Sequence, residues 1–375
     1  MRKGIKERCR RVVVKLGTST LVYPNGQLNL CRIEHLVRQL ADLHNRGIEV
    51  LLVSSGAIGV GANRMGFKKV PATMPEKQAL AAIGQGALLH LYEKIFAEYG
   101  KIVAQVLLTR GDLDDRIRYL NATNTLLAIL AMGVIPIINE NDTVVVEEIK
   151  FGDNDTLSAL VAGIVNADLL LILSDVDGLY DSDPRLNSSA RLLTHVGEIT
   201  DEMEENSRNR GSSFSSGGML TKLKAARMCM AAGVPMVIAN SEVENVIIRV
   251  LSGEEMGTLF IPREDRKMHA RKKWIAFGTV VQGRISVDSG AVTALLKRGK
   301  SLLPSGVLRV EGEFERGTVV AVVSPEGKEI ARGMVNYSAE ELKLIAGKKT
   351  SEIEEILGEK DYDEVIHRNN LWVDN

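Results

Sequence analysis

Acidic and carboxamide side chains gather in two short stretches near the middle of the chain. The first is Asn139-Glu-Asn-Asp142 and the second is Asp153-Asn-Asp155. Four carboxylates and three carboxamides this close together are unfavourable unless a metal ion, a lysine or an ammonium-bearing ligand meets them. Each stretch alone is typical of a polar turn. Because both follow the apolar run 134–138, a binding site is as good an interpretation as two turns.

Two lysines occupy positions that suit an anion. Lys15 interrupts the β-branched run 11–16 just before Gly17, and a buried ammonium group needs a partner. We expect Lys15 at a strand end, in contact with a phosphate; a solvated lysine on an edge strand is the alternative. Lys222 follows two glycines in the first turn of a predicted helix over 219–232, where N–H groups also favour an anion. No Gly-x-x-x-x-Gly-Lys-Ser/Thr motif occurs, which excludes a Walker A loop.

A loop of small residues, Ser54-Ser-Gly-Ala-Ile-Gly-Val-Gly61, follows a second apolar run. Its serine hydroxyls and N–H groups, at the start of a predicted helix, suit an anion such as a carboxylate. The spacing of its three glycines does not match the Gly-x-Gly-x-x-Gly fingerprint of dinucleotide-binding proteins. This mismatch argues against a nicotinamide-dependent oxidoreductase. The structural alternative is close packing of a helix by small residues.

Apolar runs alternate with segments of helical periodicity through the first two thirds of the chain. This alternation predicts β-α-β units, and hence an open α/β sheet whose ligands bind at the carboxyl ends of its strands. The charged residues 114–118 are predicted to form a solvated loop, and residues 200–218 a mobile active-site loop. The predicted strands cover 11–16, 48–53, 102–108, 134–138, 169–173 and 234–239, and the predicted helices cover 32–46, 76–98, 121–132, 156–166 and 219–232.

Composition excludes several classes of protein. With 375 residues, 45% of them hydrophobic and 25% charged, the chain is long enough for a large core and a second domain. A formal net charge of −1 gives no global reason to expect nucleic acid or an anionic membrane as partner. Three widely spaced cysteines indicate neither a disulfide framework nor a zinc site. This cysteine usage predicts a reducing compartment, the cytoplasm, and without a run of about 18 apolar residues we expect no membrane partner.

Seven motifs between residue 11 and about residue 240 carry a family resemblance: Val12-Val-Val-Lys-Leu-Gly-Thr-Ser19, Ser54-Ser-Gly-Ala57, Asn139-Glu-Asn-Asp142, Gly152-Asp-Asn-Asp155, Leu173-Ser-Asp-Val-Asp-Gly-Leu-Tyr180, Asp183-Pro-Arg185 and Gly217-Gly-Met-Leu-Thr-Lys222. In this order they resemble the amino acid kinase family, most closely its members that phosphorylate glutamate. The resemblance implies a three-layer α/β/α domain over residues 1–262. It also implies phosphorylation of the γ-carboxylate of L-glutamate from ATP with Mg²⁺, the first step of proline biosynthesis. Ser54, Ser174 and Ser215-Ser216 stand where the family often has threonine or glycine, which leaves the fine geometry of these loops open.

The resemblance assigns roles residue by residue. Lys15 and Lys222 would be catalytic, and Asp155 would hold these lysines or the metal in position. Mg²⁺ would bind through the ATP phosphates, with Asp155 as a further candidate ligand. Glutamate would contact Ser55, Asp142, Asp153 and Asn154. ATP would contact Lys15, Gly17, Ser174, Asp175, Ser216, Gly217, Gly218, Met219, Leu220, Thr221 and Lys222.

The sequence pattern changes after residue 262, and this change predicts a second domain. Residues 263–273 resemble a charged linker, and residues 274–357 contain short strand candidates with glycine turns, which predict a small β-rich barrel. The pattern from Val287 to Gly306 resembles the PUA domain, a module of many RNA-modifying proteins. Residues 271–375 contain 16 basic and 16 acidic side chains, so RNA binding is not supported by charge. Residues 358–375 are expected to be a C-terminal tail.

Other acceptors and other partners remain open. N-acetylglutamate or aspartate would be an alternative acceptor, and an RNA-binding protein acting through the PUA-like domain would be an alternative function. The resemblance implies feedback inhibition by proline, and the segment 109–124 is expected to cover the acceptor site. It also implies a homo-oligomer, dimer or tetramer, and channelling of the product to glutamyl phosphate reductase.

Overall fold

The computed structural model describes residues 2–23, 25–67, 69–144, 153–184, 186–187, 189–208, 218–262 and 281–373. These residues divide into two compact units: the first comprises described residues of Met1–Asp112 and Ile117–Lys267, and the second comprises Leu113–Arg116 and described residues of Met268–Asn375. Each unit has its own core of buried apolar side chains. Within the described residues, no helix is long and apolar enough to cross a membrane.

The first unit is built on a sheet of eight strands in the order β3-β4-β2-β1-β5-β7-β8-β6. The six strands from β3 to β7 are parallel, whereas β8 is antiparallel to β7. Central parallel strands are buried on both faces, which explains the continuous apolar runs in the sequence. The strands are β1 (Arg11–Leu16), β2 (Glu49–Val53), β3 (Val103–Leu108), β4 (Ile135–Glu140), β5 (Leu169–Ser174), β6 (His195–Val196), β7 (Met236–Asn240) and β8 (Thr258–Phe260).

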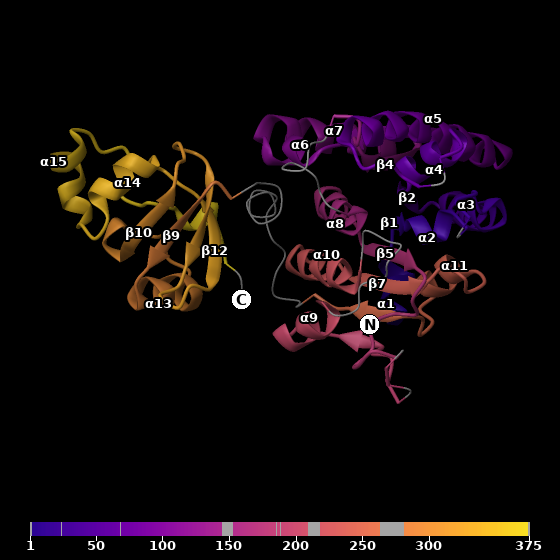
Figure 1. Cartoon of the computed structure of the whole chain (residues 1–375). Helices are drawn as coiled ribbons and strands as arrows, with labels where there is room; N and C mark the ends of the chain where they lie inside the picture. Colours follow the sequence, from indigo (N-terminus) through magenta and orange to yellow (C-terminus); the bar gives the residue numbers. More distant parts are fainter. Residues whose placement is uncertain are drawn as a thin grey trace. The chain divides into compact units, whose positions relative to one another are not determined.

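Helices cover both faces of this sheet. Figure 1 shows α8 (Asn154–Ile164) and α10 (Met219–Ala231) side by side on one face, with α3 (Leu30–Asn45) and α11 (Val246–Leu251) on the other. The periodic apolar side chains of α3 are fully buried, as an amphipathic helix on a sheet requires. The predicted three-layer α/β/α domain is therefore confirmed. The other helices of this unit are α1 (Arg2–Arg8), α2 (Thr18–Leu21), α4 (Ala57–Arg64), α5 (Met74–Glu98), α6 (Arg110–Asp114), α7 (Arg116–Ala131) and α9 (Asp201–Arg208).

Helices α4 and α5 pack with almost no space between their backbones. A Cβ atom on Gly61 would lie 1.9 Å from the carbonyl oxygen of Leu80, and one on Gly84 would lie 1.8 Å from that of Ala57. Only glycine is compatible with such an approach. Gly56, which caps α4, has a φ of +86°, a conformation that also favours glycine. Close packing thus accounts for part of the small-residue loop, while its serines remain at the sheet edge.

The charged residues 114–118, predicted as a solvated loop, belong in part to helices. Helix α6 ends at Asp114 and α7 already begins at Arg116. Asp112 accepts hydrogen bonds from the backbone N–H of Thr109, at 2.8 Å, and from its hydroxyl, at 2.7 Å. Arg118 lies 3.4 Å from the other oxygen of Asp112. These local contacts stabilise helix starts that the hydrophobic pattern does not reveal.

The second unit contains a five-stranded sheet in the order β10-β9-β11-β12-β13. Strands β9 and β11 are parallel, and the other neighbours are antiparallel. Its elements are β9 (Gly283–Val287), α13 (Ser289–Arg298), β10 (Val307–Gly312), β11 (Val319–Val323), β12 (Glu329–Met334), α14 (Ala339–Ile345), α15 (Ile353–Leu357) and β13 (Leu371–Val373). Helices α13 and α14 were not predicted.

Part of the expected C-terminal tail, residues 358–375, belongs to the second unit. Strand β13 pairs with β12, and the buried side chains of Ile366 and Leu371 contact the backbone at Gly333. Arg316 binds Glu341 in α14 as well as Glu359 and Asp361 from this segment. Apolar burial and ion pairs therefore hold residues that composition alone marks as a tail.

Candidate active site

The register of the parallel strands places the predicted site residues along one edge of the sheet. Lys15 in β1 pairs with Val53 in β2 and with Ile172 in β5, and Val53 pairs with Ile138 in β4. The residues that follow these positions therefore emerge together at the carboxyl ends of the strands, where open α/β sheets bind ligands. They are Ser54 and Ser55 after β2, Asn139 and Glu140 at the end of β4, and Ser174 at the end of β5.

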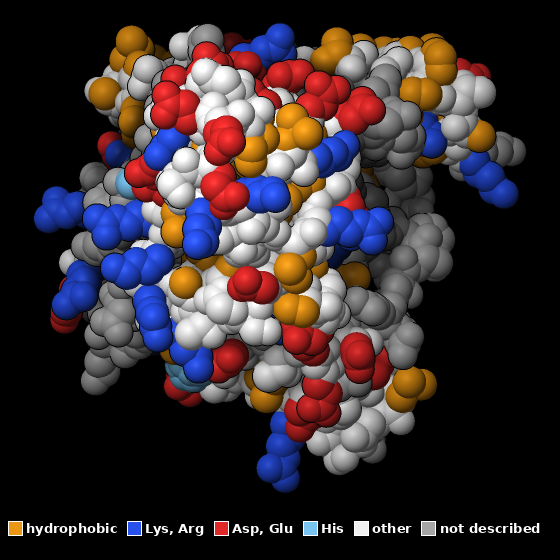
Figure 2. All heavy atoms as spheres, turned by 90° about the vertical axis from the view of Figure 1, so that its left-hand side faces the viewer, with side chains coloured by type: hydrophobic (Ala, Val, Ile, Leu, Met, Phe, Trp, Pro, Cys, Tyr) orange, Lys and Arg blue, Asp and Glu red, His pale blue; other side chains and the backbone are white. Residues whose placement is uncertain are grey.

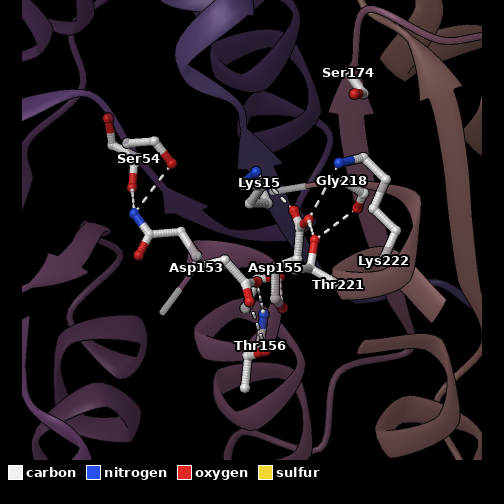
Figure 3. Close-up of polar contacts among 12 residues, drawn as sticks. Lys15, Ser54, Asp153, Asp155, Thr156, Ser174, Gly218, Thr221 and Lys222 are labelled. Atoms are coloured by element: carbon white, nitrogen blue, oxygen red, sulfur yellow. Dashed lines mark hydrogen bonds and ion pairs between the residues drawn. The ribbon is translucent and has the colours of Figure 1, made fainter. Parts of the chain in front are cut away.

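Asp155 lies at the centre of this edge, in the first turn of α8, and is fully buried. The Lys15 ammonium lies 2.6 Å from Oδ1 of Asp155, and the Lys222 ammonium lies 3.2 Å from Oδ2. Figure 3 shows the two lysines approaching the carboxylate from two sides, one from β1 and the other from α10. Both lysines are themselves buried. The structure thus brings together the three residues predicted to be catalytic.

Charge pairing keeps Asp155 ionised. Burial on its own raises the pKa of a carboxyl group, but the charges of Lys15 and Lys222 outweigh it and lower the pKa of Asp155 below its ordinary value. The hydroxyl of Thr221 also lies within hydrogen-bonding distance, 2.9 Å from Oδ2. Two ammonium groups share this one carboxylate, and the carboxyl group of Asp153 is close enough to interact with Lys15 and Asp155. Such a cluster can attract and stabilise an anion such as a phosphoryl group.

The contacts of Asp155 do not suit a residue that binds a metal ion. Both of its oxygens are already engaged by ammonium groups, so a cation could bind only by displacing a lysine. Across the described residues, no group of three or more His, Cys, Asp and Glu side chains is arranged to hold a metal ion. The geometry therefore favours the first predicted role of Asp155, which is to hold the lysines in position. Magnesium would have to enter with the phosphates of the nucleotide.

The residues predicted to bind ATP lie around the two lysines. Gly17 follows β1, and a Cβ atom on it would lie 3.7 Å from the Lys15 ammonium, so the backbone approaches this group closely. Ser174 lies at the tip of β5 (Figure 3), and its hydroxyl donates to Asp175 at 3.0 Å. Gly218 caps α10, whose first turn is formed by Met219, Leu220, Thr221 and Lys222. Ser216 and Gly217 lie outside the described residues.

Two residues predicted to bind glutamate, Ser55 and Asn154, are in direct contact. The Asn154 amide group donates to the Ser55 hydroxyl at 3.1 Å and to the Ser54 carbonyl oxygen at 2.5 Å. It also donates to the side-chain oxygen of Asn139 at 2.6 Å. These contacts link the start of α8 to the ends of β2 and β4, and fix the position of Asn154 at the sheet edge.

Asp153 and Asp142 lie at different places near this edge. Asp153 caps α8 and accepts from the Thr156 backbone N–H at 2.8 Å, so its carboxylate is directed toward the helix (Figure 3). Burial, and then the charge of Asp155, raise the pKa of Asp153. Asp142 lies in the turn that directly follows β4. Their roles as glutamate ligands remain predictions.

Two buried residues with polar groups at this edge, Tyr92 and Gln85, were not singled out from the sequence. Tyr92 of α5 lies 3.0 Å from the Ser54 hydroxyl, and Gln85, two turns earlier on the same helix, accepts from the Asn139 amide at 3.0 Å. Burial raises the pKa of Tyr92, so the phenol stays protonated. The sequence contained one signal: Gln85 is flanked by Gly84 and Gly86 on a helix whose other inward positions are mostly apolar. Its partners become visible only in the structure.

Comparison with known proteins places these features in context. Residues 10–240 match the amino acid kinase family, and residues 283–357 match the PUA domain. A protein from Moorella thermoacetica named glutamate 5-kinase is 57% identical over 366 residues, 98% of this chain and 97% of that protein. A protein of the same name from Thermoanaerobacter sp. is 56% identical over 363 residues, 97% of each. Among solved structures, a UMP kinase from Bacillus anthracis is 21% identical with a TM-score of 0.46, and the match covers 68% of this chain and 96% of that one.

Proposed function

Because the chain belongs to the amino acid kinase family, we propose that it transfers the γ-phosphoryl group of ATP to the γ-carboxylate of L-glutamate. The observation that carries this proposal is the pair of buried ammonium groups on Asp155 at the carboxyl ends of the strands. The names of the near-full-length relatives support glutamate as the acceptor. The product, L-glutamyl 5-phosphate, would enter proline biosynthesis.

The proposed reaction requires no proton transfer to or from the acceptor. An oxygen of the acceptor carboxylate forms a bond to the γ-phosphorus, the bond to the bridging oxygen of the β-phosphate breaks, and ADP leaves with that electron pair. The carboxylate is already ionised near neutral pH, so no general base is required. Catalysis therefore reduces to alignment of the two reactants and to stabilisation of charge on the transferring group.

The buried lysines supply charge where this reaction needs it. Lys15 from β1 and Lys222 from α10 would contact the phosphoryl oxygens from two sides, and Asp155 would keep both ammonium groups in place. Backbone N–H groups at the start of α10 would contact the phosphates of the nucleotide. Mg²⁺ arriving with ATP would add further neutralisation. Ser174 and Asp175 would face the nucleotide from the end of β5.

The acceptor would bind on the other side of Asp155. Ser55 and Asn154 are held together there, and Asp142 and Asp153 add carboxylates that suit the ammonium group of an amino acid. Glutamate would thus be placed with its γ-carboxylate toward the lysines. Asp153 is assigned to this site together with its observed role as the cap of α8.

A coupled trapping assay tests the proposal. The purified full chain is incubated with ATP, Mg²⁺ and hydroxylamine, which converts an acyl phosphate into a hydroxamate. L-Glutamate, N-acetylglutamate and L-aspartate are compared as acceptors. We expect hydroxamate and ADP in equal amounts with glutamate, and background with the other two. If hydroxamate forms only with N-acetylglutamate or only with aspartate, that compound and not glutamate is the acceptor. If ADP forms but none of the three acceptors yields hydroxamate, phosphorylation of a carboxylate is overturned.

The proposal includes finer points about regulation and context. Proline would inhibit by competing with glutamate, since it shares an α-carboxylate and an ammonium group, and the segment 109–124 would respond to it. The enzyme would act in the cytoplasm as a homo-oligomer, dimer or tetramer, and pass its unstable product to glutamyl phosphate reductase. We keep the predicted division into a kinase domain of residues 1–262, a linker of 263–273 and a PUA-like domain of 274–357.

RNA binding through the second unit is the competing function, and the PUA match is the observation that favours it. Against it, Figure 2 shows basic and acidic side chains on the same face of the molecule, in line with the equal numbers of the two in residues 271–375. A filter-binding assay with salt titration separates the two functions. Binding of RNA that weakens steeply with salt would support this alternative, whereas no retention above background would exclude it.

A further inference from the structure

We infer that Gln85 of α5 is a positioning residue that, through Asn139, helps to hold Asn154 with its oxygen toward the acceptor. This inference rests on the proposed function, because it concerns the ammonium group of an amino-acid substrate. Gln85 is 8% exposed and Asn139 is 4% exposed, so neither amide can satisfy its hydrogen bonds with bulk water. The two side chains form a bridge between α5 and the acceptor side of the site.

Three amide side chains make up this bridge in a fixed order. The Gln85 amide nitrogen donates to the carbonyl oxygen of Glu140 at 3.4 Å, and the Gln85 oxygen accepts from Asn139 at 3.0 Å. The Asn139 oxygen in turn accepts from the Asn154 amide nitrogen at 2.6 Å. The last amide nitrogen also donates to the Ser54 carbonyl oxygen. The chain of hydrogen bonds therefore begins and ends on a backbone carbonyl.

These two carbonyl oxygens determine the direction of every bond between them. A backbone carbonyl can only accept, so Gln85 must turn its nitrogen toward Glu140 and its oxygen toward Asn139. Asn139 must then donate to Gln85 and accept from Asn154. Reversing any one amide would bring two nitrogens or two oxygens into contact and leave a buried group unpaired, which is unfavourable. Asn154 is thus held from two ends, directly by the Ser54 carbonyl oxygen and, through Asn139, by Gln85.

The bridge has a chemical consequence for the acceptor site. The nitrogen of the half-exposed Asn154 amide is directed into the protein, so its oxygen is the atom left for a ligand. An amide oxygen accepts a hydrogen bond from an ammonium group and repels a carboxylate. Asn154 would therefore select the ammonium end of the acceptor, and Gln85, by holding Asn139, would keep the Asn154 amide in this place together with the Ser54 carbonyl oxygen.

Two substitutions of Gln85 separate this role from a purely structural one. Gln85→Leu removes the acceptor for Asn139 and lets Asn139 move away from Asn154, whereas Gln85→Glu keeps that acceptor but buries a charge. We expect the KM for glutamate to rise about tenfold in Gln85→Leu and less than about threefold in Gln85→Glu, with the KM for ATP within about twofold in both. The melting temperature should fall at least as much in Gln85→Glu, because a buried carboxylate is the more costly change.

The opposite ranking of the two variants in KM and in melting temperature is the decisive result. Gln39→Leu serves as a matched control, because Gln39 is 1% exposed and binds the backbone N–H of Ile247 at the start of α11. It should lose stability with KM values within about twofold of the wild type. The inference would be overturned if the KM for glutamate rose in proportion to the loss of melting temperature across the three variants. It would also be overturned if this KM stayed unchanged in Gln85→Leu. Hydroxamate formation by the wild type tests the proposed function separately, since it does not depend on Gln85 being the residue that orients Asn154.

Discussion

The ammonium group of Lys15 lies 2.6 Å from Asp155 Oδ1, and both side chains are almost completely removed from solvent. A buried ion pair is seldom a net source of stability, because removing two charges from water costs about as much as their attraction returns. Here a second ammonium group, that of Lys222, shares the same carboxylate. Two buried ammonium groups on one carboxylate are better explained by the binding of an anion than by folding.

Asp155→Asn should impair both turnover and folding. The substitution keeps the shape of the side chain but leaves two buried ammonium groups without a counter-charge. We expect kcat to fall at least on the order of a hundredfold, and the free energy of unfolding to fall by roughly 3 kcal/mol. Steady-state kinetics and urea unfolding measure the two effects. The control is Asp168→Asn, at an aspartate that accepts from the exposed backbone N–H groups of Arg10 and Arg11. Wild-type turnover in Asp155→Asn would remove this residue from the active site.

Lys15→Met and Lys222→Met should each lower kcat by about a hundredfold or more, because each removes charge stabilisation that is felt mainly in the transition state. The KM for glutamate should change far less than kcat. Lys224→Met is the matched control, since Lys224 lies exposed on the same helix as Lys222. Near-normal turnover in either active-site variant would sink the assignment of that lysine.

Asp142→Ala should act chiefly on the KM for glutamate, since an ammonium partner is engaged in the ground state as well as in the transition state. We expect a rise of about tenfold or more with a much smaller change in kcat. Initial rates over a range of glutamate concentrations give both constants. An unchanged KM would place Asp142 outside the acceptor site.

The second unit should lose stability as the pH falls from about 4.5 to about 2. Hydrogen bonds from Arg316 lower the pKa of Glu341 to about 2 from an ordinary value of 4.5. A carboxyl group with a lowered pKa in the folded state stabilises that state above pH 4.5, and this contribution is lost as the pH falls from about 4.5 to about 2. Glu341→Gln, which can keep the cap of α14, should weaken the protein near pH 6 and flatten this dependence. Urea unfolding near pH 6 and near pH 3, with exposed Glu354→Gln as control, measures the difference. If the free energy of unfolding fell equally between pH 6 and pH 3 in the wild type and in Glu341→Gln, this prediction would be wrong.

Proline should raise the apparent KM for glutamate without changing kcat. Asp112 fastens the start of α6 to Thr109 and, through Arg118, to α7. Asp112→Ala should loosen this segment and raise the proline concentration for half-inhibition about fivefold or more, with less than a twofold change in the KM for glutamate. Glu93→Ala, at an exposed position of α5, is the control. Inhibition that saturating glutamate does not relieve would place the regulatory site elsewhere, with the C-terminal domain the next suspect.

Much of the first unit could be predicted from the sequence because its signals are local. Buried parallel strands appear as unbroken apolar runs, and the helix over residues 32–46 has apolar positions that match one face. The strand ends then gather polar residues at one edge by topology alone. The contact between Lys15 and Asp155 could be predicted only through the family resemblance. The two residues are separated by 139 residues, and no local sequence pattern links positions so far apart.

What could not be predicted depends on contacts between distant residues. The amide bridge at Gln85 joins α5 to β4 and α8, and a glutamine in a helix is usually solvated. The early start of α7 follows from the contacts of Asp112, which outweigh the charged composition there. Strand β13 is only three residues long and depends on an edge provided by β12. None of these features has a periodic pattern that could be read from the chain.

The position of β1 in the sheet also bears on how the protein is made. Among the strands of the described residues it is synthesised first, yet it lies between β2 and β5. One edge can pair once residues 49–53 have been synthesised, but the other has no partner until residues 169–174 follow. Asp155, which neutralises Lys15, is also made late in this interval. The nascent chain thus carries an open strand edge and a lysine without its counter-charge until residues 155–174 have been synthesised.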